Sequence, residues 1–225
     1  MVGVCDPKQA IAFGYCWPVM DLPLASAKPA PRSGSARRQE LLDIAAEVFA
    51  AKGIAHTTVR DIAEEGGILS GSLYHHFVSK DQMVVEILVD GLSDAHERDA
   101  GIIAGASDPA EAMHQLIRAF IGWIADEPAV ARILLNDRQY ITETPELRAI
   151  QARRSENVSL WIELAREGIE SGVFSASIDA EVVVRAIFDG MLAAVRWLPP
   201  RGSSTPEEIG RQLADFYLAG LRLGA

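Results

Sequence analysis

Residues 68–80, ILSGSLYHHFVSK, gather many of the side chains in this chain that could do chemistry. The adjacent His75 and His76 are of the type that binds metal ions or acts as a general base. Neighbouring residues on a helix point about 100° apart, so the two rings do not converge on one ion. No Cys or carboxylate stands four residues from either histidine. Tyr74, with small hydroxyl residues before it and Lys80 after it, instead indicates a surface that contacts phosphates.

The rest of the chain carries no recognisable catalytic signature. It contains no nucleophile elbow, no phosphate-cradling P-loop and no Rossmann glycine pattern. An enzyme for small acyl substrates could use an apolar helical half, but no nucleophile, base and acid stand at a useful spacing. We therefore predict a protein that is not an enzyme and needs neither a metal nor a cofactor.

Two short helices, preceded by a longer packing helix, must position residues 68–80. Apolar residues at helical spacing predict a first helix over 37–52, which Gly53 ends. Thr58 and Asp61 form a capping-box variant that opens a second helix, to about Glu65. The glycine pair that follows breaks it, and a third helix is expected over 70–77. This arrangement is a helix-turn-helix, in which the third helix lies in the major groove of DNA.

The remaining sequence also predicts helices only. Ser79 and Gln82 begin a long fourth helix that runs to about Ile103. Proline and capping residues mark the later helices, which are expected over 108–125, 128–138, 145–172, 179–198 and 205–223. No segment alternates like a strand, so the predicted fold class is all-α. We expect a tail over 1–36, a DNA-binding domain over 37–78, and a ligand-binding and dimerisation domain over 79–225.

Charge is distributed unevenly. The formal net charge of −10 disfavours nucleic acid as a partner when it is taken as an average. Residues 1–80 carry eight Lys and Arg and eight Asp and Glu side chains, so the acidic excess lies in 81–225. The segment KPAPRSGSARR (28–38) has four positive charges and no acid, and such an arm can follow a phosphate backbone.

The first 36 residues are rich in Pro, Ala, Gly and Ser and are predicted to be disordered. The two cysteines, Cys5 and Cys16, lie there and form no disulfide framework, so a reducing, cytoplasmic location is expected. Pro18 and Asp21 interrupt a mildly apolar run, which disfavours a signal peptide; Met20 is an alternative start. No stretch is long enough to cross a membrane.

The sequence TTVRDIAEEGGILSGSLYHHFVSKDQMV resembles the DNA-binding signature of the TetR family of bacterial repressors. The matching features are the Thr pair, D-I-A, the glycine-containing turn, L-Y-H-H-F and S-K, within residues 37–83. Within that family, GILSGSLYHHF is most similar to the actinobacterial repressors of cholesterol-ring (ketosteroid) catabolism, which respond to a CoA thioester of a steroid fragment. One departure is Leu69, where many members have a Ser that caps the third helix; Ser70 is then the next candidate cap.

The resemblance implies that Tyr74 and Lys80 contact phosphates. Packing of Tyr74 within the domain and simple solvation of Lys80 are the alternatives. Small residues at the start of the third helix are expected to face the groove, and Leu73 and Phe77 to face the core. The full set predicted to bind DNA is Arg37, Arg38, Thr57, Thr58, Ser70, Gly71, Ser72, Tyr74, His75 and Lys80.

The second half is expected to hold an apolar pocket with a few polar anchors. Arg185 and Asp189 stand four apart on an apolar helix, where charged side chains need partners. They could pair with each other or with the partner subunit. Alternatively, Arg185 could face the pocket and bind a carboxylate or CoA phosphate of the ligand. A Trp on such a helix belongs to the core more often than to a pocket wall. The candidate ligand-binding residues are Trp123, Tyr140, Trp161, Arg185 and Asp189, with Trp197 as a further candidate.

The last two predicted helices are apolar enough to expose a large patch on a monomer. Packed against a second copy, they would form the four-helix interface of a homodimer. The sequence therefore predicts a homodimeric repressor that binds a palindromic double-stranded DNA operator. A small hydrophobic or acyl-CoA-type inducer, from lipid or steroid catabolism, would release it. The alternative is a DNA-binding activator or regulator without a small-molecule inducer.

Overall fold

The computed structural model describes residues 33–198 and 204–222, and within these ranges every regular element is a helix. This confirms the predicted all-α class. Most of the predicted tail, with Cys5, Cys16 and the first part of the basic arm, lies outside the described residues. No helix in the described ranges combines the length and apolar character needed to cross a bilayer.

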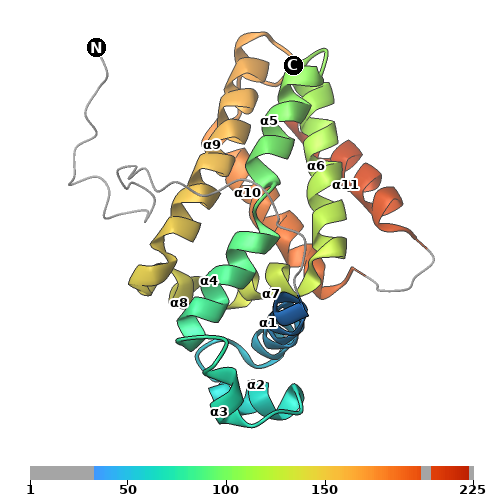
Figure 1. Cartoon of the computed structure of the whole chain (residues 1–225). Helices are drawn as coiled ribbons and strands as arrows, with labels where there is room; N and C mark the ends of the chain where they lie inside the picture. Colours follow the sequence, from blue (N-terminus) through green and yellow to red (C-terminus); the bar gives the residue numbers. More distant parts are fainter. Residues whose placement is uncertain (1–32, 199–203, 223–225) are drawn as a thin grey trace.

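The helix-turn-helix forms one end of the molecule, at the bottom of Figure 1. Its helices are α1 (Ser33–Lys52), α2 (Val59–Glu65) and α3 (Ser70–Leu73). The first helix begins four residues before the predicted start at Arg37. The third is regular only over four residues, because the backbone then tightens into turns through Tyr74 and His76. Gly53 ends α1 as predicted, in the left-handed conformation with φ 83°.

The prediction of one long fourth helix is wrong, because the chain forms two helices there, α4 (Lys80–Gly91) and α5 (Ala95–Gly105). In a continuous helix the Gly91 carbonyl would accept the N–H of Ala95. Here it accepts the indole N–H of Trp123 at 2.8 Å, and the Ala95 N–H turns to Leu92 O at 3.3 Å. A Cβ on Gly91 would lie 2.7 Å from Val130, so close packing of α7 also marks this break.

The larger half consists of the remaining helices, drawn from green to red in Figure 1. They are α6 (Pro109–Asp126), α7 (Pro128–Asn136), α8 (Arg138–Glu143), α9 (Arg148–Glu170), α10 (Ala180–Ala193) and α11 (Pro206–Arg222), with 3-10 turns at Pro145–Leu147 and Ala194–Arg196. The N-terminal caps predicted for α6 and α10 are present. The Asp108 carboxylate accepts the N–H groups of Ala110 and Glu111, and the Asp179 carboxylate accepts that of Val182.

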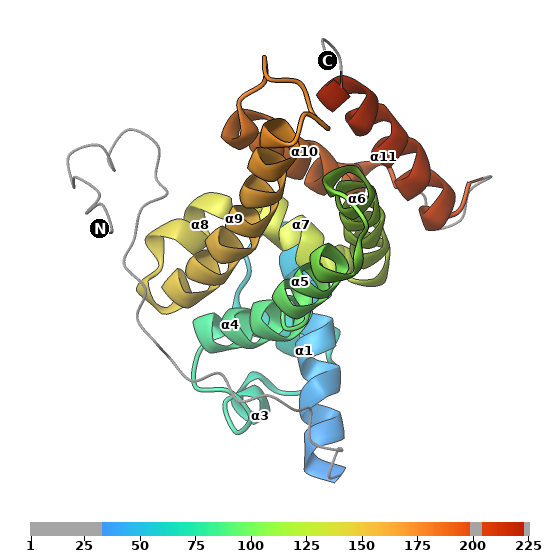
Figure 2. The same ribbon diagram turned by 90° about the horizontal axis from the view of Figure 1, so that it is seen from above.

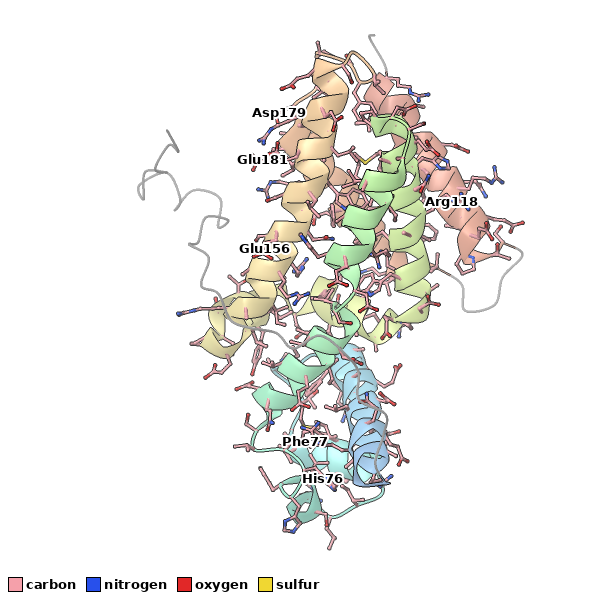
Figure 3. The ribbon with its side chains drawn as sticks, turned by 45° about the horizontal axis from the view of Figure 1, so that its top comes forward. His76, Phe77, Arg118, Glu156, Asp179 and Glu181 are labelled. Atoms are coloured by element: carbon pink, nitrogen blue, oxygen red, sulfur yellow. The ribbon has the colours of Figure 1, made fainter. Side chains whose placement is uncertain are left out.

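Helix α6 is the centre of this half. It is buried along the face that carries Met113, Leu116, Ile117 and Ile121. Helix α11 packs along its outer side, as Figure 2 shows from above. The Arg118 side chain of α6, labelled in Figure 3, reaches α11 and donates to Glu207 at 2.9 Å. One continuous apolar core joins both halves, because α1 packs on α4 and α7. The division between residues 78 and 79 therefore stays a prediction.

Candidate DNA-binding surface and ligand cavity

Local capping holds α2 in place beside α1. The Thr58 hydroxyl accepts the Asp61 N–H at 3.2 Å, and the Asp61 carboxylate accepts the Thr58 N–H at 2.7 Å. This confirms the predicted capping role of Thr58. Lys52 lies 2.7 Å from the same carboxylate. The Lys52 ammonium and then the Thr58 donors hold the pKa of Asp61 well below its usual range.

The turn before α3 uses Gly67 in the left-handed region, with φ 63°. Leu69 occupies the N-cap position and provides no side-chain cap, so α3 begins at Ser70. Leu73 and Phe77 are buried, as predicted. Figure 3 shows His76 and Phe77 at this end of the molecule.

The opposite side of this segment faces solvent. We call it the α3 face and define it as Leu69, Ser70, Gly71, Ser72, Tyr74 and His75. The Tyr74 side chain is 59% exposed, so the alternative of a packing tyrosine does not describe it. Leu69 is 80% exposed and the nearby Val78 85%. Sequence reasoning did not assign either apolar residue to this surface.

The two arginines of the predicted set hold α1 to its neighbours. Arg38 donates two hydrogen bonds to Glu86, at 2.5 and 2.6 Å, and its guanidinium lies 4.5 Å from the centre of the Phe77 ring. The hydrogen bonds that Arg38 donates to the Glu86 carboxylate raise the pKa of Arg38 above its ordinary value. Arg37 donates to the Gly66 carbonyl at 3.0 Å. Both side chains therefore position the turn and α3 from behind the exposed face.

Thr57 and Lys80 also have structural partners. Thr57 is buried and donates its hydroxyl hydrogen to Gly53 O at 2.8 Å. The Lys80 ammonium donates to Ile54 O at 2.7 Å and to Thr57 O at 3.1 Å. Simple solvation therefore does not describe Lys80. Its contacts secure the loop between α1 and α2, and one of its three N–H donors remains for another acceptor.

The junction of α7 and α8 ties the ligand half to the DNA-binding half. The Asp137 carboxylate accepts the Ile54 N–H at 2.9 Å, and the Tyr140 hydroxyl donates to Asp81 at 2.5 Å. Burial, and then the hydrogen bond to Asp81, raises the pKa of Tyr140 to about 12. Burial likewise raises the pKa of Asp137. These contacts join the α7–α8 junction to the loop after α1 and to the first turn of α4.

A cavity of about 70 Å³ lies in the larger half, between the α4–α5 break and helices α6, α7, α9 and α10. Aromatic rings form much of its apolar wall. The Phe120 and Phe188 centroids are 5.2 Å apart, and those of Phe120 and Trp123 are 5.4 Å apart. Polar lining residues are His96, Arg98, Arg153, Arg154, Asn157 and Asp189.

The predicted ligand-binding residues divide between the cavity and other places. Trp123 and Asp189 line it. The side chain of Trp161 is fully buried behind the wall, Tyr140 faces α4, and Arg185 pairs with Glu181 at 2.6 Å. Trp197 is 55% exposed. Helical periodicity identifies a buried face, but it does not tell a core contact from a cavity wall, and this explains the division.

A buried carboxylate organises the polar wall of the cavity. Asp99 is fully buried and accepts two hydrogen bonds from Arg98, at 2.9 and 3.0 Å. Asn157 Nδ2 and Trp161 Nε1 donate to its other oxygen, each at 2.8 Å. Sequence reasoning missed this group because its members come from α5 and α9, far apart in the chain.

Arg154 is the second polar feature that the sequence did not identify. Burial, followed by the neighbouring charge of Arg138, lowers the pKa of Arg154, and Asp189 acts in the opposite direction. Asp189 also lies 4.0 Å from Arg138. The described residues contain no group of three His, Cys, Asp or Glu side chains placed to hold a metal ion.

Comparison with known proteins places both halves among bacterial regulators. Residues 41–87 match the family described as bacterial regulatory proteins, tetR family, and residues 106–221 match the tetracyclin repressor-like C-terminal domain. The HTH-type transcriptional repressor KstR2 of Mycolicibacterium smegmatis is 37% identical over 195 residues, which are 87% of this chain and 95% of that protein.

Solved structures agree with these matches. The ketosteroid transcriptional regulator KstR2 of Mycobacterium tuberculosis superposes with a TM-score of 0.77 at 37% identity, covering 83% of this chain and 95% of that one. AibR, solved with isovaleryl coenzyme A and operator DNA, has a TM-score of 0.69 at 22% identity, covering 82% and 97% of the two chains. At that identity, AibR is similar in fold alone.

Proposed function

Because the chain belongs to the TetR family of bacterial transcriptional regulators, we propose that it is a ligand-responsive repressor that binds a palindromic operator as a homodimer. Its relatives are DNA-binding transcriptional repressors, and it is not an enzyme. The observation that carries the proposal is the pairing of the exposed α3 face with a separate cavity in the other half. It would act in the cytoplasm, where operator DNA is accessible.

The α3 face supplies the proposed DNA contacts. Ser70, Gly71 and Ser72 are small enough for the α3 backbone to approach base edges, and the two serine hydroxyls can donate or accept hydrogen bonds. Tyr74 and His75 would reach phosphates, and the Thr58 hydroxyl and Lys80 are further proposed phosphate contacts. Exposed Leu69 suits apolar contact with a thymine methyl group. Arg37, Arg38 and Thr57 would act by positioning this surface, given their internal partners.

Tyr74→Phe is expected to weaken operator binding about five- to tenfold, because one hydroxyl–phosphate hydrogen bond contributes about 1 kcal/mol. The loss should be similar for operator and unrelated DNA, since phosphates carry no sequence information. Fluorescence anisotropy over a range of salt concentrations measures both. A thermal melt equal to that of the parent protein would serve as the folding control. Unchanged affinity on both DNAs would remove the phosphate role from Tyr74.

The homodimer would form through α10 and α11. Val182 and Phe216 on these helices are 64% and 71% exposed, which is unusual for large apolar side chains. Figure 2 shows both helices at the outer rim, where a second copy has access. A two-fold axis there would present two α3 faces to successive major grooves, about 34–36 Å apart. Light scattering of the full chain should give twice the monomer mass.

The proposed inducer is a small hydrophobic or acyl-CoA-type molecule. KstR2 is a ketosteroid regulator by name, which supports a role in steroid or lipid catabolism. The aromatic wall suits an apolar body. A cavity of about 70 Å³ is small compared with such a ligand, so binding would have to part the surrounding helices. That displacement would reach α2 and α3 through the contacts of Asp137 and Tyr140.

A gel-shift titration tests the proposal, using DNA from upstream of the protein's own gene and a panel of acyl-CoA thioesters and free acids. Saturable binding that one ligand abolishes is the expected result. Binding that no ligand disturbs would favour a regulator without an inducer. If no complex forms at low salt, selection from random sites decides between a missing operator and a wrong assignment of the α3 face.

A further inference from the structure

The Asp99 group determines how Asn157 faces the cavity. A buried carboxylate accepts hydrogen bonds, so the donor end of the Asn157 amide must point to Asp99, where Nδ2 lies 2.8 Å from Oδ2. The acceptor end, Oδ1, is thereby turned away from this group. It is buried and has no hydrogen-bond partner among the described residues. Asn157 lines the cavity, so a ligand with an N–H or O–H donor could satisfy this oxygen.

The cations of the cavity wall differ in their partners. Arg98 is paired with Asp99, and Arg153 donates to Ser93 O at 3.2 Å. Arg154 is half-buried, and its guanidinium makes no hydrogen bond or ion pair within 4 Å to the side chains or backbone that the structure describes. Its surroundings disfavour the charged form, because burial and Arg138 act together against it. An anion beside the guanidinium would reverse this disadvantage.

The charge of the wall agrees with an anionic ligand. Three arginines and His96 line the cavity, and Asp189 is the one acid among the described lining residues. This is opposite to the protein's net charge of −10. The negative charge of Asp189 favours the charged form of Arg154. A ligand anion beside the guanidinium would have the same effect.

We infer that the cavity binds an amphipathic anion that carries a hydrogen-bond donor close to its charged group. Arg154 pairs with the anionic group, Asn157 Oδ1 accepts the donor, and the apolar body packs against Phe120, Trp123 and Phe188. Arg154 and Asn157 are three apart on α9, so their Cβ atoms are about 5–6 Å from each other. The donor and the anion of the ligand must be similarly close. This inference rests on the proposed function, because it takes the cavity as the inducer site.

Two sources supply this chemistry. A free 3-hydroxy acid has its hydroxyl near its carboxylate, and the pantoyl part of CoA has a hydroxyl near a phosphate. Calorimetry without DNA separates them, using decanoate, 3-hydroxydecanoate, methyl 3-hydroxydecanoate and 3-hydroxydecanoyl-CoA. If the carboxylate is the anion that pairs with Arg154, the hydroxy acid should bind about tenfold more tightly than decanoate. The neutral ester should then bind at least tenfold more weakly than the hydroxy acid. If only the CoA thioester binds, and its binding depends on Arg154, the anion is the CoA phosphate.

Two variants test the assigned residues. Arg154→Gln should weaken binding of the preferred anion at least tenfold and leave binding of the methyl ester unchanged. The matched control is Arg166→Gln, which removes the same charge from an exposed site farther along α9. Asn157→Ala should remove the preference for 3-hydroxydecanoate over decanoate. A general loss of packing would lower both affinities and leave their ratio unchanged.

Several results would overturn the inference. The first is equal affinity for 3-hydroxydecanoate and its methyl ester. The second is an Arg154→Gln variant whose ligand affinity falls no more than that of Arg166→Gln. The third is that none of the four probes binds. The gel shift is separate from these measurements. If the ligand preferences hold and no operator is found, the inference about the cavity stands and the proposed function fails.

Discussion

Gly71→Glu is expected to abolish operator binding and leave the fold intact. Gly71 lies at the centre of the α3 face, is exposed, and a Cβ added there meets no atom within 4 Å. The glutamate side chain would fill the space through which the α3 backbone approaches DNA, and its charge would face the phosphates. Like charges in an interface cost several kcal/mol, so a loss of about 100-fold or more is expected.

Gly101→Glu is the matched control for this experiment. Gly101 is also exposed on a helix with no atom within 4 Å of an added Cβ, but it lies on α5 in the other half. Both variants change the net charge equally and replace a helical glycine with a better helix former. Anisotropy titrations should show operator affinity close to that of the parent for Gly101→Glu alone. Equal affinities for both variants would mean that α3 does not enter the groove.

Asp99→Ala is expected to lower the free energy of unfolding by about 3–5 kcal/mol, the range typical of removing one partner from a buried ionic group. Asp99 is fully buried and accepts hydrogen bonds from Arg98, Asn157 and Trp161. Alanine would leave the half-buried Arg98 guanidinium and two buried N–H donors without their acceptor. For a chain of this size, the expected fall in Tm is about 6–20 °C.

Thermal unfolding followed by circular dichroism measures this effect. Asp94→Ala is a suitable control, because Asp94 is exposed at the start of the same helix and provides no side-chain cap. Its effect should stay within about 0.5 kcal/mol. Similar melting temperatures for the two variants would show that the Asp99 group adds little to stability. Because Asp99 also orients Asn157, the unfolding result bears on how rigidly the cavity wall is held.

The helix-turn-helix was predictable because local interactions define it. The two residues of the Thr58–Asp61 capping box are three positions apart, and the left-handed Gly53 and Gly67 lie one and two residues after the ends of their helices. The α4–α5 break was not predictable, because it depends on Trp123, which lies 32 residues beyond Gly91. Local capping and periodicity there indicate one continuous helix.

The same distinction applies to the candidate sites. Residue types and their resemblance to a family signature identified the α3 face except for Leu69, since its members lie close together in the chain. They did not separate Tyr74, which is exposed, from Arg38, which is paired with Glu86. The cavity was harder to predict, because a buried helix position can face either the core or a pocket. Trp123 lines the cavity and Trp161 lies behind it, although both stand on apolar faces.

The sequence by itself determined the all-helical class, most helix starts and the helix-turn-helix, because contacts within three or four positions produce them. The tertiary structure alone decided which side chains meet across long separations. Asp99 meets Asn157 across 58 positions, and Asp137 meets Ile54 across 83. Such pairs depend on how whole helices pack, and no local pattern records that packing. The polar wall of the cavity and the link between the two halves are both made of such pairs.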